Sequence, residues 1–352
     1  MAAEATRHYN WQGRRGGRSF RRQEKALSDL IYCFQPIYHE RIWGDRAFER
    51  LFGRTLPEGK LIGESWELAD LPEGRSRLAE GEFAGLTIDQ LLRRQGKEIL
   101  GASGGAGQGF PLLLKYLDAN DTLSLQVHPD EQTARRMGGS ARSKTECWYV
   151  LESRNGYILK GLAPGAQPED FRKALAGDDP AALLPLVRRY AARPGDFHYL
   201  PAGTVHALGS GVVVAEVQTP SDTTYRVSDW GRGRPVHLQE AMASINFDPA
   251  VASPPGAAGT AEDPTSILAA SPYFTVMRHR RPAGKLPWRL GRCAAWMVIA
   301  GAGDVWAGQG DPVRLHPGRT LLFSAALPEA TLRIEQEMTW LEIILPQDAN
   351  PH

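Results

Sequence analysis

Short apolar runs separated by turn residues dominate most of the chain. Residues 111–117 (PLLLKYL) and 123–128 (LSLQVH) have the composition of strands, and the turn sequence DAND separates them. Residues 146–151 (ECWYVL) form a third run of this kind, which Asn155-Gly156 follows. Apolar runs of this length, bounded by Gly, Asn, Asp and Pro, are typical of β-strands. The pattern therefore predicts a mainly β fold.

One segment breaks the β pattern. Within residues 168–190, apolar residues recur at helical spacing on both sides of Asp178-Asp179-Pro180, which predicts two short helices. Strand-like text returns at residues 197–200 and 212–218. We therefore expect a short helical insert, at about residues 165–192, inside a β domain.

Shifts in composition divide the chain into four parts. Residues 1–28 contain seven basic residues, only two acidic ones and few apolar ones, so we expect a disordered basic tail. Residues 250–266 are rich in Pro, Gly, Ala, Ser and Thr, which favours a linker. Between them, residues 29–249 form the first β domain. Residues 267–352 show short apolar runs broken by Gly, which predicts a second, smaller barrel.

Composition excludes several classes of protein. A net charge of +1 favours neither nucleic acid nor a membrane surface as a partner, and no run of 18 apolar residues is present to span a membrane. Cys33, Cys147 and Cys293 lie far apart, so a disulfide framework is not expected. These features predict a cytoplasmic protein. The oligomeric state is left open, with a monomer as the expectation.

Four side chains suited to binding a metal occur in strand-like segments. Gln126 and His128 are two residues apart and so face the same side of a strand. Glu146 opens a later strand, and His206 follows the turn-forming residues 201–203. Two imidazoles, a carboxylate and an amide oxygen suit Zn²⁺, with iron or manganese as alternatives. In the C-terminal part no dense group of this kind is seen.

Each of these four residues alone is more often structural than functional. The joint pattern of QxHP, TECWY and GDxxYxPxGxxHA is what favours a shared metal site. The last of these stretches resembles the second cupin motif, in which Pro and Gly turn the chain before a metal-binding histidine.

Charged and hydroxyl side chains lie close in sequence to these candidate ligands. Asp222 and Arg226 are four residues apart, and Arg226 could stabilise negative charge that develops on a substrate oxygen. Lys115 and Lys144 lie on or just before predicted strands, and such cations would pair with an anionic substrate. Ser124 lies two residues before Gln126 and so faces the same side of that strand. A solvated loop and surface lysines are the simpler interpretation of the same residues.

The chain resembles the type I phosphomannose isomerases, in their shorter bacterial form, from about Pro36 to Leu345. The motifs that carry the resemblance are YHERIWG at 38–44, IGESWELAD at 62–70, FPLLLKYLDAND at 110–121, LSLQVHPDE at 123–131, KTECWYVL at 144–151, GDFHYLPAGTVHALG at 195–209 and QTPSDTTYRVSDWGR at 218–232. The resemblance implies two cupin-like jelly-roll barrels with a short helical insert. Residues 29–249 would be the catalytic, metal-binding domain and residues 267–352 a degenerate cupin-like barrel.

The resemblance also implies an activity and its residues. The family interconverts mannose 6-phosphate and fructose 6-phosphate through a cis-enediol or enediolate, which implies a sugar phosphate as substrate and one Zn²⁺ per chain. The residues that match the zinc ligands are Gln126, His128, Glu146 and His206. The remaining matches are the catalytic Arg226, Lys144 and Asp222 and the substrate-binding Ser124, Lys115 and Glu64.

One departure from the family pattern affects the proton transfer. Longer relatives carry a histidine directly before the lysine that aligns with Lys144, and here that position is Ser143. Lys144, Asp222 or a water on the metal could carry the proton, and the sequence does not choose among them. Three other functions stay open: a sugar-binding cupin without turnover, a metal-dependent cupin oxygenase, and an isomerase for an unphosphorylated sugar. The complete ligand set, together with Asp222 and Arg226, favours the sugar-phosphate isomerase.

Overall fold

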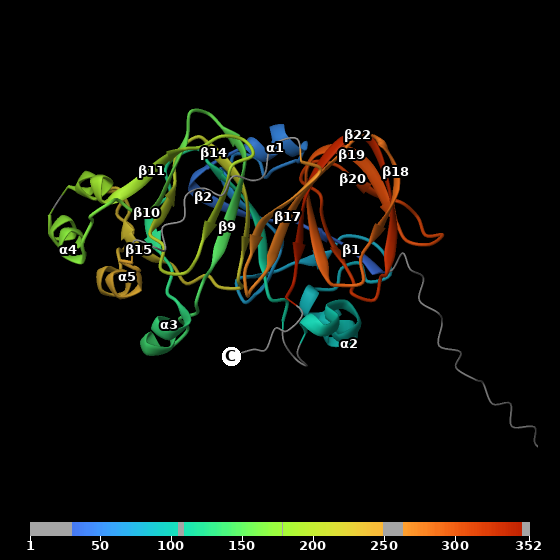
Figure 1. The fold of residues 1–352 in the computed structure, drawn as a ribbon, viewed down its shortest axis with the longest axis horizontal. Helices are drawn as coiled ribbons and strands as arrows, with labels where there is room; N and C mark the ends of the chain where they lie inside the picture. The colour runs from blue at the N-terminus through green and yellow to red at the C-terminus, as the bar shows by residue number, and fades with distance from the viewer. Residues whose placement is uncertain (1–29, 105–108, 178, 249–262, 347–352) are drawn as a thin grey trace, which may run out of the picture.

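The computed structural model shows an elongated molecule built mainly of β-sheets (Figure 1). It describes residues 30–104, 109–177, 179–248 and 263–346. The predicted tail at residues 1–28 and most of the predicted linker at 250–266 lie outside these ranges. The mainly β fold expected from the apolar runs is confirmed.

Two sheets form the part of the molecule that holds the candidate site. The six-stranded sheet has the order β12-β9-β14-β7-β3-β2 and the five-stranded sheet the order β11-β10-β13-β8-β15. Their strands are β2 (Ile37–Asp45), β3 (Ile62–Leu68), β7 (Leu113–Ala119), β8 (Leu125–Val127), β9 (Glu146–Ser153), β10 (Tyr157–Leu162), β11 (Val187–Ala191), β12 (Phe197–Leu200), β13 (His206–Leu208), β14 (Val212–Gln218) and β15 (Tyr225–Ser228). Trp148 and Val214 of the first sheet share one buried cluster with Ile158 and Leu208 of the second, so the two sheets pack face to face.

A nine-stranded sheet forms the other half of the molecule. Its order is β16-β17-β22-β19-β21-β1-β6, and β18 and β20 pair with β22 and β19. The strands are β1 (Ile31–Gln35), β6 (Arg77–Leu78), β16 (Thr265–Ala270), β17 (Thr275–Arg281), β18 (Gly284–Arg289), β19 (Ala294–Trp306), β20 (Val313–Leu315), β21 (Thr320–Phe323) and β22 (Glu329–Ile344). Because Ile31 pairs with Phe323, the first described strand belongs to the C-terminal sheet. A two-stranded ladder joins β4 (Asp70–Leu71) to β5 (Gly74–Arg75).

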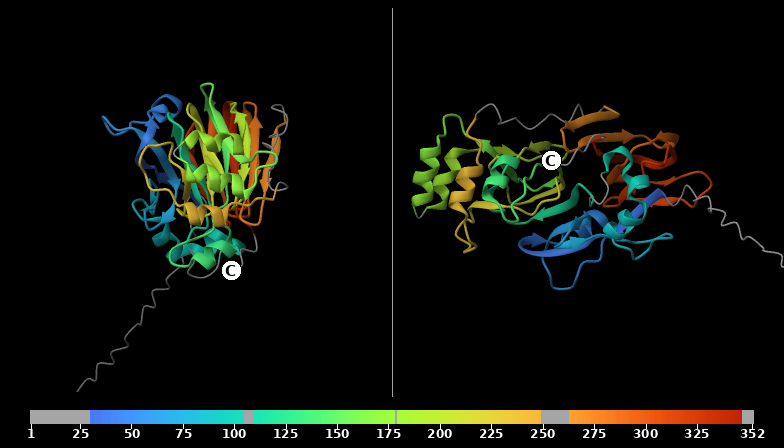
Figure 2. Two further views of the ribbon diagram at one scale, coloured as in Figure 1. Left: turned by 90° about the vertical axis from the view of Figure 1, so that its left-hand side faces the viewer. Right: turned by 90° about the horizontal axis from the view of Figure 1, so that it is seen from below.

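The helices lie at the periphery of the sheets (Figures 1 and 2). They are α1 (Ala47–Phe52), α2 (Ile88–Leu100), α3 (Glu131–Met137), α4 (Pro168–Ala176), α5 (Leu238–Ser244) and the short 3-10 helices η2 (Gly101–Ser103) and η3 (Pro180–Leu186). α4 and η3 fall inside the segment expected to be a helical insert, and the chain returns to strand at Val187. None of the helices in the described ranges is long and apolar enough to cross a membrane.

Two parts of the sequence-based architecture stay predictions. Each sheet is an open series of strands rather than a closed ring, so the two barrels are not established by the hydrogen-bond ladders. The domain limits also stay predictions: β16 begins at Thr265, inside the predicted linker, and β1 crosses to the C-terminal sheet. His279, which stands alone in the sequence, is paired in the fold, because its Nε2 lies 2.9 Å from Oε2 of Glu342.

Candidate metal centre and active site

A tight turn brings two of the predicted ligands together. The Pro201–Thr204 turn reverses the chain between β12 and β13, and Gly203 adopts a φ of +87° there. Glycine occupies this left-handed region without the strain that a side chain would add. The amide of Gly203 donates to the carbonyl of His128 at 2.8 Å, which ties the turn to the end of β8. His206, the first residue of β13, therefore lies beside β8 and pairs with Gln126.

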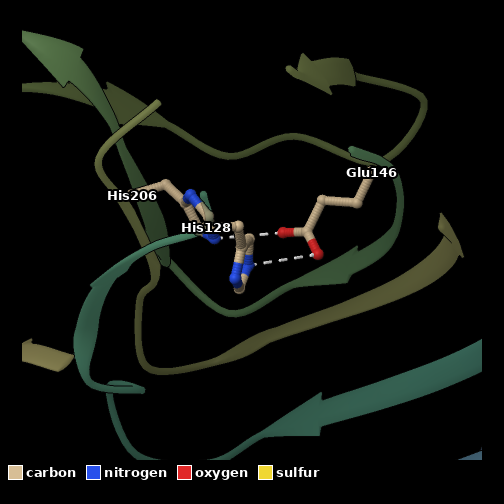
Figure 3. A group of neighbouring side chains, drawn as sticks. All are labelled: His128, Glu146 and His206. Atoms are coloured by element: carbon tan, nitrogen blue, oxygen red, sulfur yellow. Dashed lines mark ion pairs between the residues drawn. The ribbon is translucent and has the colours of Figure 1, made fainter. Parts of the chain in front are cut away.

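His128, Glu146 and His206 converge inside the β-sheet pair (Figure 3). Oε1 of Glu146 lies 3.0 Å from Nε2 of His206, and Oε2 lies 3.6 Å from Nε2 of His128. The candidate ligand atoms all lie within 4.8 Å of one another, and all three side chains are buried. The sequence prediction that these residues share one point is thus matched by their placement.

Backbone carbonyls orient both imidazoles. Nδ1 of His128 lies 2.9 Å from the carbonyl oxygen of Thr223, and Nδ1 of His206 lies 2.8 Å from that of Thr204. A carbonyl can only accept, so each Nδ1 carries a proton, and each Nε2 faces Glu146, where a neutral imidazole offers a lone pair to a metal. Histidines that bind metals are commonly held in this way.

The resulting arrangement favours a cation at its centre. Burial and the charge of Lys144 lower the pKa of His128 to about 3, so its imidazole is neutral at pH 7. Nε2 of His128 has no hydrogen-bond partner among the described residues, and Oε1 of Glu146 faces Nε2 of His206 while Lys144 is paired with Oε2. Lone pairs that face one another without a proton between them repel, and a bound cation removes that repulsion. The residues present therefore fit a metal ion.

Gln126 completes the set of predicted ligands. Its amide Nε2 lies 3.2 Å from Nε2 of His206, and the hydroxyl of Ser124 lies 3.5 Å from its Oε1. Rotation of this amide by 180° exchanges the oxygen and the nitrogen, which have nearly the same size. That rotation brings Oε1 next to His206, where it can serve as a fourth ligand.

A row of alternating charges runs from the half-buried Arg41 to Glu146. Its ion pairs are Arg41–Glu64 at 2.7 Å, Lys115–Glu64 at 3.7 Å, Lys115–Glu216 at 3.3 Å, Lys144–Glu216 at 3.8 Å and Lys144–Glu146 at 2.7 Å. All of these side chains except Arg41 are buried. Lys115 and Glu64, predicted to bind the substrate, and Lys144, predicted to be catalytic, thus form one continuous network with Glu146 of the candidate metal site.

The network controls the charge of its acidic members. Burial raises the pKa of Glu64, but Lys115 and Arg41 outweigh it and hold that pKa at about 2. Burial likewise raises the pKa of Glu146, and the charge of Lys144 lowers it well below its usual range. By contrast, burial and the charge of Glu146 raise the pKa of Glu216 to about 7.

Glu216 and Arg41 were not predicted from the sequence. Glu216 lies in β14, where its Cα partners are Lys115 and Trp148, and the Trp148 indole donates to its Oε2 at 3.2 Å. The available signal was a single acidic residue within the apolar run VVVAEVQ. A charge buried inside such a strand requires a partner, and the partner comes from another strand.

The other predicted residues lie around this group rather than within it. Arg226 pairs with Gln126 across β15 and β8, and its Nε is buried and has no partner among the described residues. Burial, then the charge of Arg234, lowers the pKa of Arg226. Asp222 is exposed and lines a neighbouring cavity of about 770 Å³ together with Thr223, whose carbonyl holds His128. No contact joins Asp222 to the clustered ligands in the described structure, and none of those three ligands lines this cavity.

A β fold with two histidines and a carboxylate in its interior is typical of the cupin class of metal-binding proteins. Residues 31–156 match the family model of the type I phosphomannose isomerase catalytic domain. Mannose-6-phosphate isomerase of Streptococcus mutans is 33% identical over 280 residues, which cover 78% of this chain and 86% of that protein. The chain therefore belongs to the type I phosphomannose isomerase family.

Solved structures share the fold. The crystal structure of mannose 6-phosphate isomerase from Bacillus subtilis aligns with a TM-score of 0.78 and 27% identity, covering 90% of this chain and 100% of that one. A zinc-bound mannose 6-phosphate isomerase aligns with a TM-score of 0.74 and 16% identity over the same share of this chain. At that identity the second likeness concerns the fold alone.

Proposed function

We propose that the protein is a metal-dependent aldose–ketose isomerase that interconverts mannose 6-phosphate and fructose 6-phosphate. Membership of the family supports the reaction, and the convergence of His128, Glu146 and His206 beside Lys144 is the observation that carries it. We place Zn²⁺, one ion per chain, on these three residues with Gln126 as the fourth ligand, because the donors are nitrogen and oxygen only.

The reaction moves one proton between two adjacent carbons of the open-chain sugar. A base takes the proton from C2 of the aldose, and the electron pair forms the C1–C2 double bond of an enediolate. The proton returns at C1 as the C2 carbonyl forms, and the proton of the O2 hydroxyl passes to O1. When bound, the metal supplies Lewis acidity to the sugar oxygens. The chain has to hold those oxygens and carry the proton.

The charged network provides the groups for these tasks. Lys144, buried beside Glu146, and Arg226, beside Gln126, place two cations next to the ligand cluster from opposite sheets. In this proposal both cations stabilise the negative charge of the enediolate, since preorganised donors in a site with little water stabilise such charge strongly. Lys144 or Asp222 carries the proton. The buried Ser124 and Lys115 bind the hydroxyl and phosphate oxygens of the sugar, and Glu64 holds Lys115 in place.

A coupled assay with mannose 6-phosphate, before and after treatment with a chelator, tests the proposal. We expect turnover that chelation abolishes and Zn²⁺ restores, with about one zinc per chain by elemental analysis. Binding of the sugar without turnover would indicate a sugar-binding protein instead. Turnover of mannose but not of its 6-phosphate would keep the isomerase and change its substrate.

A further inference from the structure

A histidine on the edge strand β2 extends the row of charges by one strand. His39 pairs with Glu64 across the β2–β3 ladder, in a stretch of unbroken register. Trp66, two residues after Glu64, pairs in the same way with Lys115 of β7. Residues that face each other in an antiparallel ladder lie on the same side of the sheet, as do residues two apart in a strand. The side chain of His39 therefore lies on the face that carries Glu64 and Lys115.

The imidazole of His39 is held in place and has an unused nitrogen. The ring is half-buried, and its centroid lies 4.3 Å from that of Trp66. Nε2 is buried and has no hydrogen-bond partner among the described residues. In either protonation state an imidazole has at least one N–H to donate. A buried ring nitrogen without a partner in the described chain favours a ligand from outside it.

Both cations at this end of the row lie near the same ring. Burial lowers the pKa of His39, and four charged groups also act on that pKa, namely Glu64, Arg41, Lys115 and Asp222. Of these, Glu64 joins the two cations, because its Oε1 contacts Arg41 and its Oε2 contacts Lys115. His39, Arg41 and Lys115 thus form a basic group around a single carboxylate.

Arg41 keeps a donor for a ligand. Its Nε lies 2.7 Å from Oε1 of Glu64, and its Nη1 donates to the carbonyl of Glu40 at 3.2 Å. Its Nη2 makes no hydrogen bond within the described ranges, and the side chain is 35% exposed. Gly63 leaves room for the arginine, because a Cβ at that glycine would lie only 2.6 Å from Cβ of Arg41. The guanidinium is therefore oriented by the chain and open on one side.

Lys115 also has donor capacity to spare. Its Nζ lies 3.7 Å from Oε2 of Glu64 and 3.3 Å from Oε1 of Glu216. An ammonium carries three N–H groups, so two carboxylate neighbours leave one of them available. A phosphate group accepts hydrogen bonds from several donors at once, and the planar fork of arginine suits its geometry. The donors left on Arg41, Lys115 and His39 match such a group.

The direction of the row agrees with the length of the substrate. Glu146 and Lys144 lie at one end of the row, and the proposed reaction at C1 and C2 of the sugar takes place there. The phosphate is attached to C6, at the opposite end of the sugar. In the sheet, β14, β7, β3 and β2 follow β9 in that order. A sugar extended along the row from Glu146 therefore carries its phosphate towards Lys115 and β2.

The neighbouring cavity of about 770 Å³ is a less suitable place for the phosphate. The charged side chains that line it are Glu73, Arg142, Asp222 and Glu240. Three carboxylates and one guanidinium repel a dianion more than they attract it.

We propose that Arg41 and His39, together with Lys115, bind the phosphate group of the substrate and so select a phosphorylated sugar. This inference rests on the sugar-phosphate isomerase function proposed above. It adds two residues of β2 to the site and fixes which end of the row receives the phosphate. Neither residue contacts the reacting carbons, so their contribution is to binding and specificity.

Calorimetric titration of the zinc-loaded protein with mannitol 6-phosphate tests the proposal. This polyol has no carbonyl group and cannot isomerise, so the titration measures binding alone. We expect Arg41→Met to raise Kd about 10- to 100-fold, as for the loss of a hydrogen bond between charged groups. His39→Phe keeps the aromatic ring against Trp66 but loses the donor, and should raise Kd about 3- to 10-fold. His39→Gln keeps an N–H donor and should recover part of that loss.

Arg142→Met is the matched control, because Arg142 is exposed and lines the neighbouring cavity. Its Kd should equal that of the wild type. An unchanged Kd in both Arg41→Met and His39→Phe overturns the proposal. A rise in Arg142→Met alone also overturns it, because the phosphate then lies in the cavity.

Crystals of the wild type grown with mannitol 6-phosphate decide the question if a variant does not fold. Phosphate density within hydrogen-bond reach of Arg41 Nη2 and His39 Nε2 supports the proposal, and density beside Arg142 contradicts it. Binding of the probe at Arg41 and His39 without turnover of mannose 6-phosphate would keep the phosphate site and remove the proposed function. Turnover together with an unchanged Kd in the β2 variants would keep the function and remove the phosphate site.

Discussion

The side-chain ammonium of Lys144 lies 2.7 Å from Oε2 of Glu146, the carboxylate whose other oxygen lies 3.0 Å from His206. One carboxylate thus contacts both the amine of a buried lysine and the place where a metal ion fits. An enediolate formed beside this carboxylate would lie within reach of both positive charges. The pairing also leaves one oxygen of Glu146 free to act as a ligand.

Replacement of Lys144 by Met tests whether this lysine acts on the substrate. The change removes the cation and keeps most of the apolar stem, so we expect kcat to fall by roughly 10²- to 10³-fold with zinc content unchanged. The measurement is kcat for mannose 6-phosphate together with elemental analysis. Lys173→Met is the matched control, since Lys173 is exposed on α4. Loss of zinc in parallel with activity would show that Lys144 serves only to position Glu146.

Arg226 is expected to act on the transition state rather than on the metal. Its side chain adjoins Gln126 across the β15–β8 ladder, and its guanidinium is partly buried. Arg226→Ala should lower kcat by roughly 10²- to 10³-fold and keep the zinc, as for the loss of one preorganised donor. Arg226→Lys, which keeps the charge but not the planar fork, should recover part of this loss. Full activity in Arg226→Ala would remove the residue from the mechanism.

The sequence was informative where chemistry and local spacing coincide. Gln126 and His128 follow from strand alternation, and His206 from the Pro-Gly turn before it, because both signals lie within a few residues. Glu216 could not be placed in this way. Its partners Lys115 and Trp148 lie on other strands, 101 and 68 residues away, and only the register of the folded sheets brings them together.

The same limit applies to the C-terminal half. His279 has no metal-binding residue near it in the sequence, yet it meets Glu342 across the ladder. β1 reads as part of the first domain and pairs instead with β21. Pairings of this kind depend on strand order, which apolar periodicity does not encode.

Asp118 should make stability depend on pH. Its side chain is buried, its Oδ2 accepts from the amide of Ala47 at 2.7 Å, and its Oδ1 has no partner among the described residues. Burial raises its pKa to about 6, compared with about 4 in an unfolded chain. The folded state therefore favours the protonated acid, and stability is lost as the pH rises from about 4 to about 6.

Asp118→Asn places at this position a side chain that is uncharged at every pH and close in shape to the protonated acid. We expect the free energy of unfolding of the variant to exceed that of the wild type by about 2–3 kcal/mol at pH 7.5 and to match it near pH 4. Urea unfolding at the two pH values measures this difference. A variant less stable than the wild type at pH 7.5 would show that the charged carboxylate is the stabilising form.

Inside the C-terminal sheet, the buried carboxylate of Glu342 is paired with the imidazole of His279. Nε2 of His279 lies 2.9 Å from Oε2 of Glu342, both side chains are buried, and the ring of His279 stacks on that of Trp340. The indole of Trp296 also donates to Oε1 of Glu342, at 3.4 Å. His279→Phe keeps an aromatic ring but leaves a buried carboxylate without its partner, so we expect a loss of about 3–5 kcal/mol in the free energy of unfolding.

The double variant His279→Phe/Glu342→Leu separates loss of the partner from loss of packing. Replacing both polar groups by apolar ones removes the unpaired carboxylate, so we expect it to recover most of the stability lost in His279→Phe. Urea unfolding of the two single variants and the double variant gives their interaction energy. A double variant that is as unstable as the sum of the single changes would mean that the aromatic packing around Trp340 matters more than the polar pair. Because the pair lies in the other sheet from the ligand cluster, kcat of the folded variants should equal that of the wild type.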